Sequence, residues 1–243
     1  MICRFRLALC APLFAALLLP LVARAQEKKP ENSAIKPVPR DARWMERHNK
    51  MNERVKQGNV GLLMIGDSIT QGWEGAGREV WAKYYAPRNA VNLGIGGDQT
   101  QHVLWRLENG NIDGISPKAA VIMIGTNNSG GHTPEQIAEG VQAIVAKLRA
   151  KLPETKVLIL AIFPRGADEK DARRQVCMKT NAIVAKLADE KMVFYLDIGP
   201  KFLAADGTLS KEVMPDLLHL NPKSYATWAE AIEPTLAKLL GEK

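Results

Sequence analysis

A serine and a histidine that lie far apart in the chain have the residue types that nucleophilic catalysis needs. Ser68 stands in Gly66-Asp67-Ser68, directly after an apolar run. A free hydroxyl is a weak nucleophile at neutral pH, so it needs an adjacent general base that takes its proton. His219 is a candidate base, because Asp216, three residues before it, can hold the imidazole Nδ1–H and leave Nε2 free. These residues predict acyl transfer through Ser68, with Asp216 and His219 as its acid–base partners.

Both motifs also have a purely structural interpretation. Asp67 or Ser68 can serve as an ordinary helix cap, and an isolated Asp-x-x-His can be a capping aspartate beside a surface histidine. The other histidines are weaker candidates for the base. His48 falls in an N-terminal helix pattern, His102 in an amphipathic helix, and His132 in a Gly-rich loop with no carboxylate at helical spacing. The last histidine of the chain is therefore the predicted base.

Two further motifs are suited to hold the oxyanion that forms when a hydroxyl attacks an ester. The Gly-rich stretch 92–98 brings backbone N–H groups close to a ligand, because glycine has no Cβ. It differs from a dinucleotide loop, since Gln99 stands where the third glycine of G-x-G-x-x-G belongs. We therefore expect the N–H groups of Ser68 and Gly97 to bind the oxyanion. Asn127 can aim its side-chain amide at the same atom, although an Asn-rich turn is the alternative interpretation.

Alternating strands and helices are expected to position these motifs. Short apolar runs without polar alternation are typical of parallel strands buried on both faces. The expected strands are Val60–Ile65, Ala90–Leu93, Ala119–Ile124, Val157–Phe163 and Val193–Leu196. The expected helices are Asp41–Gln57, Arg78–Tyr85, Thr100–Asn109, a segment starting at Thr133-Pro134, Asp171–Asp189 and Lys223–Leu240. This order predicts a doubly wound α/β fold with a parallel sheet, in which ligands meet the carboxyl ends of the strands.

The N-terminal residues have the pattern of an export signal. Arg4 and Arg6 precede the apolar run Leu7–Val22, and Ala23-Arg24-Ala25 offers a small-x-small cleavage site that makes Gln26 the mature start. A membrane anchor is the alternative, but a spanning helix needs about 20 apolar residues. We expect residues 1–25 to be a signal peptide, 26–40 a flexible leader and 41–243 the folded domain. The expected location is periplasmic or extracellular, with no stable membrane insertion after cleavage.

Composition limits the classes of function. Loss of residues 1–25 removes three arginines and no acid, so the formal charge falls from +7 to 7 − 3 = +4. No block of basic residues interleaved with aromatics marks a nucleic-acid interface. Cys177 is then the sole cysteine, which excludes an internal disulfide in the mature chain. The sequence leaves the oligomeric state open, a homodimer included.

Taken together, the motifs resemble those of the SGNH/GDSL hydrolase superfamily, which is named for Ser, Gly, Asn and His in four conserved blocks. Ser68, Gly97, Asn127 and His219 match these positions, and Asp216 matches the aspartate of the family's D-x-x-H. Several stretches are similar to the catalytic subunits of intracellular platelet-activating factor acetylhydrolase of type Ib. These stretches are 92–98, 102–107, 125–128, 163–166 and 218–220.

The resemblance implies a flavodoxin-like three-layer α/β/α sandwich with a five-stranded parallel sheet. It also implies hydrolysis of short acyl esters, acetyl above all, without a metal or another cofactor. An export signal departs from the intracellular namesakes, so an acetylated carbohydrate stands beside a platelet-activating-factor-like lipid as the expected substrate. An acyltransferase with the same triad, and a non-catalytic carbohydrate- or lipid-binding module, are the alternatives.

Overall fold

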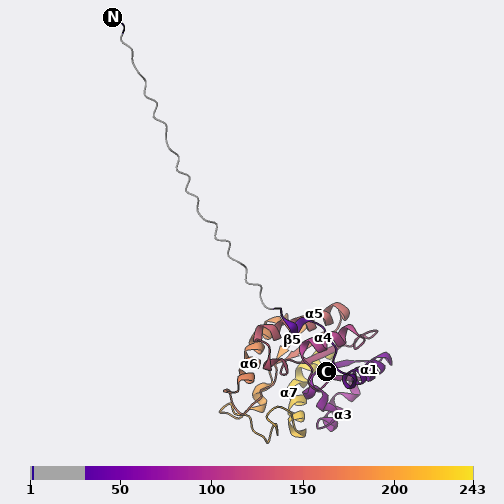
Figure 1. The fold of residues 1–243 in the computed structure, drawn as a ribbon. Coiled ribbons are helices and arrows are strands. Elements are labelled where there is room, and N and C mark those ends of the chain that lie inside the picture. Colours follow the sequence, from indigo (N-terminus) through magenta and orange to yellow (C-terminus); the bar gives the residue numbers. More distant parts are fainter. Residues whose placement is uncertain (1, 3–30, 243) are drawn as a thin grey trace. The chain divides into compact units, whose positions relative to one another are not determined.

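Five parallel strands form one sheet in the order β2-β1-β3-β4-β5. Figure 1 labels strand β5 of this sheet together with helices α1 and α3 to α7. The strands are β1 Leu62–Gly66, β2 Ala90–Gly94, β3 Ala119–Met123, β4 Lys156–Leu160 and β5 Val193–Leu196. The computed structural model describes Ile2 and residues 31–242. This sheet confirms the predicted α/β fold with five parallel strands.

Helices connect the strands and cover the sheet. The α-helices are α1 Ala42–Lys56, α2 Ser68–Gln71, α3 Arg78–Tyr84, α4 Thr100–Glu108, α5 Pro134–Lys151, α6 Ala172–Val184 and α7 Pro222–Leu240. The 3-10 turns are η1 Ser33–Ile35, η2 Gly72–Glu74, η3 Ala86–Arg88, η4 Asn128–Gly130, η5 Ala185–Leu187 and η6 Gly199–Phe202. Among the described residues, no helix has the length and apolarity needed to cross a membrane.

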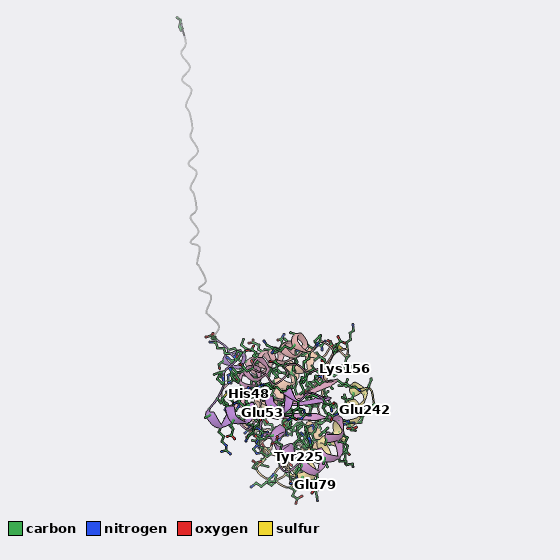
Figure 2. All side chains as sticks on the ribbon, turned by 90° about the vertical axis from the view of Figure 1, so that its right-hand side faces the viewer. His48, Glu53, Glu79, Lys156, Tyr225 and Glu242 are labelled. Atoms are coloured by element: carbon green, nitrogen blue, oxygen red, sulfur yellow. The ribbon has the colours of Figure 1, made fainter. Side chains whose placement is uncertain are left out.

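Alternate side chains of each strand enter two separate cores, as the pleat of a strand requires. Leu63 and Ile65 of β1 pack in a core with residues of α1, α4 and α5. Leu62 and Met64 pack on the opposite face of the sheet, in a core that α7 completes. Figure 2 shows the molecule from a second side, with His48 of α1 higher in the view than Tyr225 of α7. Helices on both faces make the three layers that the sequence predicts.

Local capping signals explain where the helices begin. The Asp41 side chain accepts a hydrogen bond from the N–H of Trp44 and so caps α1 at the predicted residue. Thr133 and Gln136 form a reciprocal capping box at the start of α5, with Pro134 as the first helical residue. Strand β4 ends three residues earlier than predicted. The backbone N–H and C=O of Ile162 pair with the Asn181 side chain, so they are not available to a neighbouring strand.

The segment from Asn32 to Arg40 differs from the flexible leader that the sequence suggests. Ala34 is fully buried, and its carbonyl oxygen accepts a hydrogen bond from Thr100. The Asn32 amide donates to the carbonyl oxygen of Gln136. The burial of Ala34 and the hydrogen bonds to α4 and α5 hold this part of the expected leader against the domain. The expected signal peptide, apart from Ile2, and residues 26–30 lie outside the described residues.

Candidate active site

The strand order places the end of β1 at the switch point of the sheet. The chain leaves β1 toward β2 on one side and later enters β3 on the other. In open α/β sheets a crevice forms at such a point, outside the carboxyl ends of the strands. Ser68 follows β1 after a single residue, so it stands at this crevice.

The structure brings Ser68, His219 and Asp216 into one hydrogen-bonded chain. The hydroxyl oxygen of Ser68 lies 2.8 Å from Nε2 of His219, across 151 residues of sequence. The Nδ1 atom of the same imidazole lies 2.6 Å from a carboxylate oxygen of Asp216. The side chains of His219 and Asp216 are 44% and 56% exposed, so the site opens to solvent.

The protonation of these groups follows from their partners. Partial burial alone would raise the pKa of Asp216, but hydrogen bonds from the backbone N–H and the imidazole of His219 outweigh it and lower that pKa. Asp216 is therefore a carboxylate at neutral pH and can only accept hydrogen bonds. The proton of a neutral His219 imidazole must then sit on Nδ1, which leaves the lone pair of Nε2 facing the Ser68 hydroxyl.

The Asp-x-x-His segment differs locally from the helical turn that its spacing suggests. One carboxylate oxygen of Asp216 accepts the backbone N–H groups of both Leu218 and His219, as in an Asx turn. Leu217 between them has φ of +59°, a left-handed conformation that is uncommon outside glycine. The carbonyl oxygen of Leu217 accepts the N–H of Gly166. The turn, rather than a helix, thus aims Asp216 and the imidazole at each other.

Ser68 is the first residue of a single helical turn, α2, that Asp67 caps. The Oδ1 atom of Asp67 accepts the N–H of Ile69 at 3.0 Å, while its Oδ2 atom is buried without a hydrogen-bond partner. Burial raises the pKa of Asp67 to about 7, because desolvation disfavours the charged carboxylate. The Tyr225 hydroxyl, which comes from α7, donates to the carbonyl oxygen of Ile69. These contacts fix the backbone that carries the nucleophile candidate.

Gly96 lies beside Ser68, and both its backbone C=O and its backbone N–H are held by side chains. The Arg40 guanidinium donates to the carbonyl oxygen of Gly96 at 2.8 Å, and the N–H of Gly96 donates to Gln71 at 2.7 Å. A trans peptide points its C=O and its N–H in opposite directions. Because Arg40 holds the carbonyl oxygen of Gly96 on one side of the Gly96–Gly97 peptide, the N–H of Gly97 points to the opposite side. Gly97 has φ of +77°, which favours glycine at this position.

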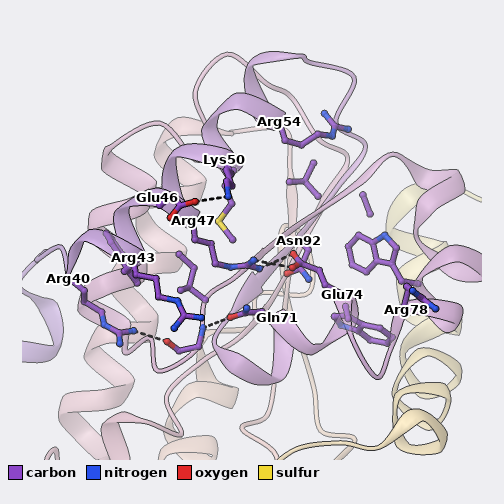
Figure 3. A pocket seen from close by; sticks show the side chains of 18 of the residues that line it. Arg40, Arg43, Glu46, Arg47, Lys50, Arg54, Gln71, Glu74, Arg78 and Asn92 are labelled. Carbon is purple, nitrogen blue, oxygen red and sulfur yellow. Dashed lines mark hydrogen bonds and ion pairs between the residues drawn. The ribbon is translucent and has the colours of Figure 1, made fainter.

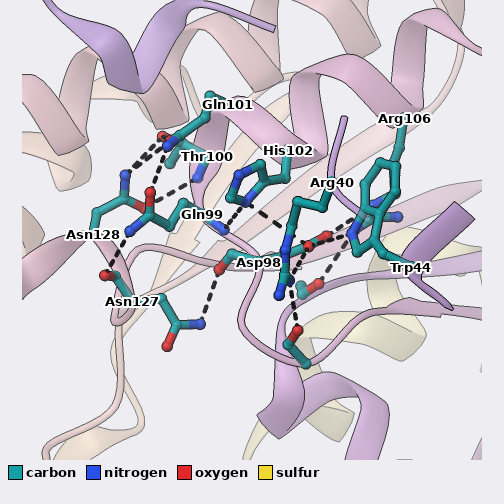
Figure 4. Close-up of polar contacts among 12 residues, drawn as sticks. Arg40, Trp44, Asp98, Gln99, Thr100, Gln101, His102, Arg106, Asn127 and Asn128 are labelled. Carbon is teal, nitrogen blue, oxygen red and sulfur yellow. Dashed lines mark hydrogen bonds and ion pairs between the residues drawn. The ribbon is translucent and has the colours of Figure 1, made fainter. Parts of the chain in front are cut away.

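Asn127 is tied to the same loop (Figure 4). Its side-chain nitrogen donates one hydrogen to the carbonyl oxygen of Asp98 at 2.9 Å. Its backbone oxygen accepts the side-chain amide of Gln99 at 3.0 Å. The second amide hydrogen of Asn127 forms no hydrogen bond within the described residues. The structure thus joins the loops that follow β2 and β3, which carry the predicted Gly97 and Asn127.

A buried charged network supports this loop, and the sequence did not reveal it. The carboxylate of Asp98 is fully buried and accepts hydrogen bonds from Arg106 at 2.9 Å, Trp44 at 2.7 Å and Arg40 at 3.2 Å. Arg106 is itself fully buried. A single arginine in the otherwise apolar stretch around Leu104 was the one available signal. Nothing in the sequence around Arg40 indicated its role.

The chain contains four histidines, and His219 is the one that contacts Ser68. His102 accepts the N–H of Gln99 through Nδ1 and so caps α4, where the sequence suggested packing. His132 forms a second Ser–His contact, since its Nε2 lies 2.8 Å from the hydroxyl of Ser33. Its Nδ1, however, is buried without a partner, so no carboxylate orients this imidazole.

No group of three or more His, Cys, Asp or Glu side chains within residues 31–242 is arranged to hold a metal ion. Burial raises the pKa of the Cys177 thiol to about 11, so this free cysteine is protonated and inert at neutral pH.

Comparison with known proteins places the chain in a family. A profile of the GDSL-like lipase/acylhydrolase family matches residues 64–227. The platelet-activating factor acetylhydrolase IB subunit alpha1 of Pongo abelii is 39% identical over 217 residues, which cover 87% of this chain and 93% of the relative. A putative acylhydrolase from Bacteroides fragilis superposes with a TM-score of 0.67 at 19% identity, over 83% of this chain and 99% of the other.

A catalytic mutant of an acetylxylan esterase from Geobacillus stearothermophilus superposes with a TM-score of 0.58 at 18% identity, over 76% of this chain and 96% of the other. At such identities the two solved structures show the fold, while the family profile and the relative carry the assignment. The chain therefore belongs to the GDSL-like lipase/acylhydrolase family, and it is an ester hydrolase.

Proposed function

We propose that this protein hydrolyses short-chain acyl esters, acetyl esters above all, with Ser68 as the nucleophile. One observation carries this proposal. The Ser68 hydroxyl, the His219 imidazole and the Asp216 carboxylate form a continuous chain of hydrogen bonds, with separations of 2.8 and 2.6 Å. This is the arrangement that activates a weak hydroxyl nucleophile.

The reaction begins when Nε2 of His219 takes the Ser68 proton and the hydroxyl oxygen attacks the ester carbonyl carbon. The imidazolium that forms is stabilised by the Asp216 carboxylate, which stays ionised. His219 then gives its proton to the leaving alcohol, and an acyl-enzyme remains on Ser68. A water molecule repeats the sequence and releases the carboxylic acid and the free serine.

Three donors hold the oxyanion in this proposal: the backbone N–H groups of Ser68 and Gly97 and the side-chain amide of Asn127. Within the described residues, neither backbone N–H donates to a protein acceptor. The Arg40 contact to Gly96 and the Asn127 contact to Asp98 fix two of these donors before substrate arrives. Donors fixed in advance stabilise a transition-state charge without reorganisation.

The substrate is an acetylated carbohydrate or a lipid that resembles platelet-activating factor. The names of similar proteins support both, since one relative is a platelet-activating factor acetylhydrolase subunit and one structural neighbour is an acetylxylan esterase. The export pattern of residues 1–25 favours the carbohydrate. We propose that cleavage before Gln26 releases the mature enzyme to the periplasm or the medium.

The test is hydrolysis of p-nitrophenyl acetate by the mature protein and by two matched variants. Ser68→Ala should reduce kcat by more than a thousandfold, to the residual level of sites that lose a triad member (~10³–10⁴ over water). Ser33→Ala removes the other serine that contacts a histidine and should leave kcat unchanged. Equal losses in both variants would overturn the assignment of Ser68. Product analysis with and without an added sugar acceptor separates hydrolysis from acyl transfer.

A further inference from the structure

A cleft of about 1000 Å³ opens beside the candidate active site, between α1, the η2–α3 segment and the edge strand β2 (Figure 3). Its charge is unbalanced, since six cationic side chains and three carboxylates line it. The cationic side chains are Arg40, Arg43, Arg47, Lys50, Arg54 and Arg78. The carboxylates belong to Asp41, Glu46 and Glu74.

The carboxylates are already engaged. Glu74 pairs with Arg47 through both of its oxygens, at 2.8 and 3.0 Å. Glu46 pairs with Lys50 at 2.7 Å. Asp41 caps the N-terminus of α1. These acids therefore leave most of the other cationic side chains of the cleft without a neutralising partner.

Two arginines keep their full donor capacity. The guanidinium groups of Arg43 and Arg78 form no hydrogen bond and no ion pair with any residue in the described part of the chain, and both residues are exposed. Figure 3 shows Arg43 extending from α1 toward Gln71, with Arg78 at the other side of the cleft. A guanidinium presents a planar fork of donors that fits a carboxylate in a bidentate manner. The cleft thus offers two unengaged sites for anionic groups.

The cleft borders the candidate active site at Gly96. Gln71 and Gly96 line it, and they hydrogen-bond to each other through the Gly96 N–H. A Cβ built on Gly96 would lie 3.8 Å from the Cβ of Ser68. A substrate whose ester carbonyl reaches Ser68 can therefore extend its neighbouring groups past Gly96 into this cleft.

The remaining lining suits a sugar chain better than a lipid tail. Trp81 is partly exposed at the cleft, and an exposed indole face can stack on a sugar ring. The side-chain nitrogen of Gln71 has no partner within residues 31–242, so it can donate to a hydroxyl. A long acyl or alkyl chain could contact the apolar lining residues Ala90, Val91 and Ile95, but it would also desolvate the arginines beside them, which costs free energy.

We propose that this cleft binds the carboxylate groups of an acidic oligosaccharide, so that the substrate of the enzyme is an O-acetylated uronic-acid-containing glycan. The proposal rests on the esterase function above and specifies the alcohol part of its substrate. Arg43 and Arg78 bind carboxylates of the sugar residues that flank the acetylated one. Binding there holds the chain across the mouth of the site and presents an acetyl group to Ser68.

The test compares two substrates that differ only in whether C6 of each sugar is a carboxylate or a neutral hydroxymethyl group. O-acetylated oligogalacturonides carry carboxylates, and the same oligomers after reduction of the carboxyl groups are neutral. The acidic oligomer should have the higher kcat/KM, and its advantage should shrink when the ionic strength rises, because salt screens exposed charges. The double variant Arg43→Gln/Arg78→Gln should reduce the ratio of the two kcat/KM values roughly tenfold.

The matched control removes two positive charges elsewhere. Lys179 on α6 and Lys238 on α7 are exposed and belong to helices that do not line the cleft. Lys179→Gln/Lys238→Gln should leave the ratio unchanged. Equal losses in both double variants would mean that net charge alone attracts the oligomer, and the proposed cleft site would be wrong.

Binding without turnover separates this proposal from the esterase proposal. Ser68→Ala should bind the deacetylated oligogalacturonide by calorimetry, and addition of Arg43→Gln/Arg78→Gln should weaken that binding. If p-nitrophenyl acetate is not hydrolysed but this binding persists, the esterase proposal fails and the cleft site stands. If the enzyme is active but has a higher kcat/KM for the neutral oligomer or an acetylated ether phospholipid than for the acidic oligomer, the cleft proposal fails and the esterase proposal stands.

Discussion

The guanidinium of Arg40 donates to the carbonyl oxygen of Gly96 at 2.8 Å, on the side of the peptide opposite the N–H of Gly97. A segment that precedes the first helix thus holds the loop that follows the second strand. The same guanidinium contacts the buried carboxylate of Asp98. One side chain therefore couples the N-terminal segment to the proposed oxyanion hole.

Replacing Arg40 with methionine should lower kcat for p-nitrophenyl acetate by about 10- to 100-fold, because a misoriented Gly97 N–H no longer meets the oxyanion. KM should change less, since the ground-state ester gains little from that donor. Arg40→Lys keeps one donor within reach of Gly96 and should recover part of kcat. A change of KM alone, or no recovery with lysine, would show that Arg40 does not act through this peptide.

Asn127→Ala should reduce kcat by roughly 10²–10³, the usual cost of one oxyanion donor. Its side chain also holds the carbonyl oxygen of Asp98, so the thermal unfolding of the variant has to be measured alongside. Gln99→Ala removes the contact to the Asn127 backbone and keeps the amide, which makes it the structural control. An effect confined to KM would mean that Asn127 binds the ground state and the transition state equally well, and so does not act as a transition-state donor.

Asp67→Asn should stabilise the protein above neutral pH. The unfolded chain releases the Asp67 proton near pH 4, whereas burial raises its pKa to about 7 in the folded state. Unfolding therefore releases a proton between these values, and the free energy of unfolding falls as the pH rises through this window. Asparagine keeps the cap on Ile69 without the charge, so the variant should be more stable by about 2 to 4 kcal/mol at pH 8.

Urea unfolding at pH 4, 6 and 8 measures this difference. Asp206→Asn is the control with a pKa shift of the opposite sign, because hydrogen bonds from Thr208 lower the pKa of that exposed carboxyl. This variant should not be more stable than the wild type at any of the three pH values. The difference in the free energy of unfolding between Asp67→Asn and the wild type should grow from pH 4 to pH 8. A constant difference would contradict the raised pKa of Asp67.

Acyl chain length should have a sharp optimum at acetyl. The loop from Gly125 to Thr133 is short and polar, and six cationic side chains line the adjacent cleft, so a long chain would have to desolvate charged groups. Each buried CH₂ would contribute about 0.8 kcal/mol to binding only where an apolar trough exists. We expect kcat/KM for p-nitrophenyl esters to fall steeply beyond butyrate. Fastest turnover of octanoyl or longer esters would indicate a lipase-like pocket instead.

The sequence predicted the residues at the strand ends because two regular patterns located them. Apolar runs marked the strands, and Gly, Asp and Asn directly after three of the runs marked the loops. Since all strands are parallel, those loops meet at one edge of the sheet. That reasoning placed Ser68, Gly97 and Asn127 together without knowledge of the strand order.

The contacts that sequence reasoning missed depend on tertiary packing. Arg40 lies in a Pro-rich stretch without periodicity, and its partners Gly96 and Asp98 are more than fifty residues away. Leu217 adopts a left-handed conformation that no property of leucine favours, and neighbouring contacts impose it. Neither feature has a local signal that a pattern of residues could reveal.

Covalent labelling of the protein with a serine-directed phosphonate tests the central claim most directly. The reagent reacts with a hydroxyl only where a base activates it, and peptide mass spectrometry identifies the labelled residue. The Ser68–His219–Asp216 chain predicts one label, on Ser68, that His219→Ala abolishes. Ser129 and Ser224 are buried, and their hydroxyls donate to backbone carbonyls. A label on either of them, or on Ser33 beside His132, would contradict the account.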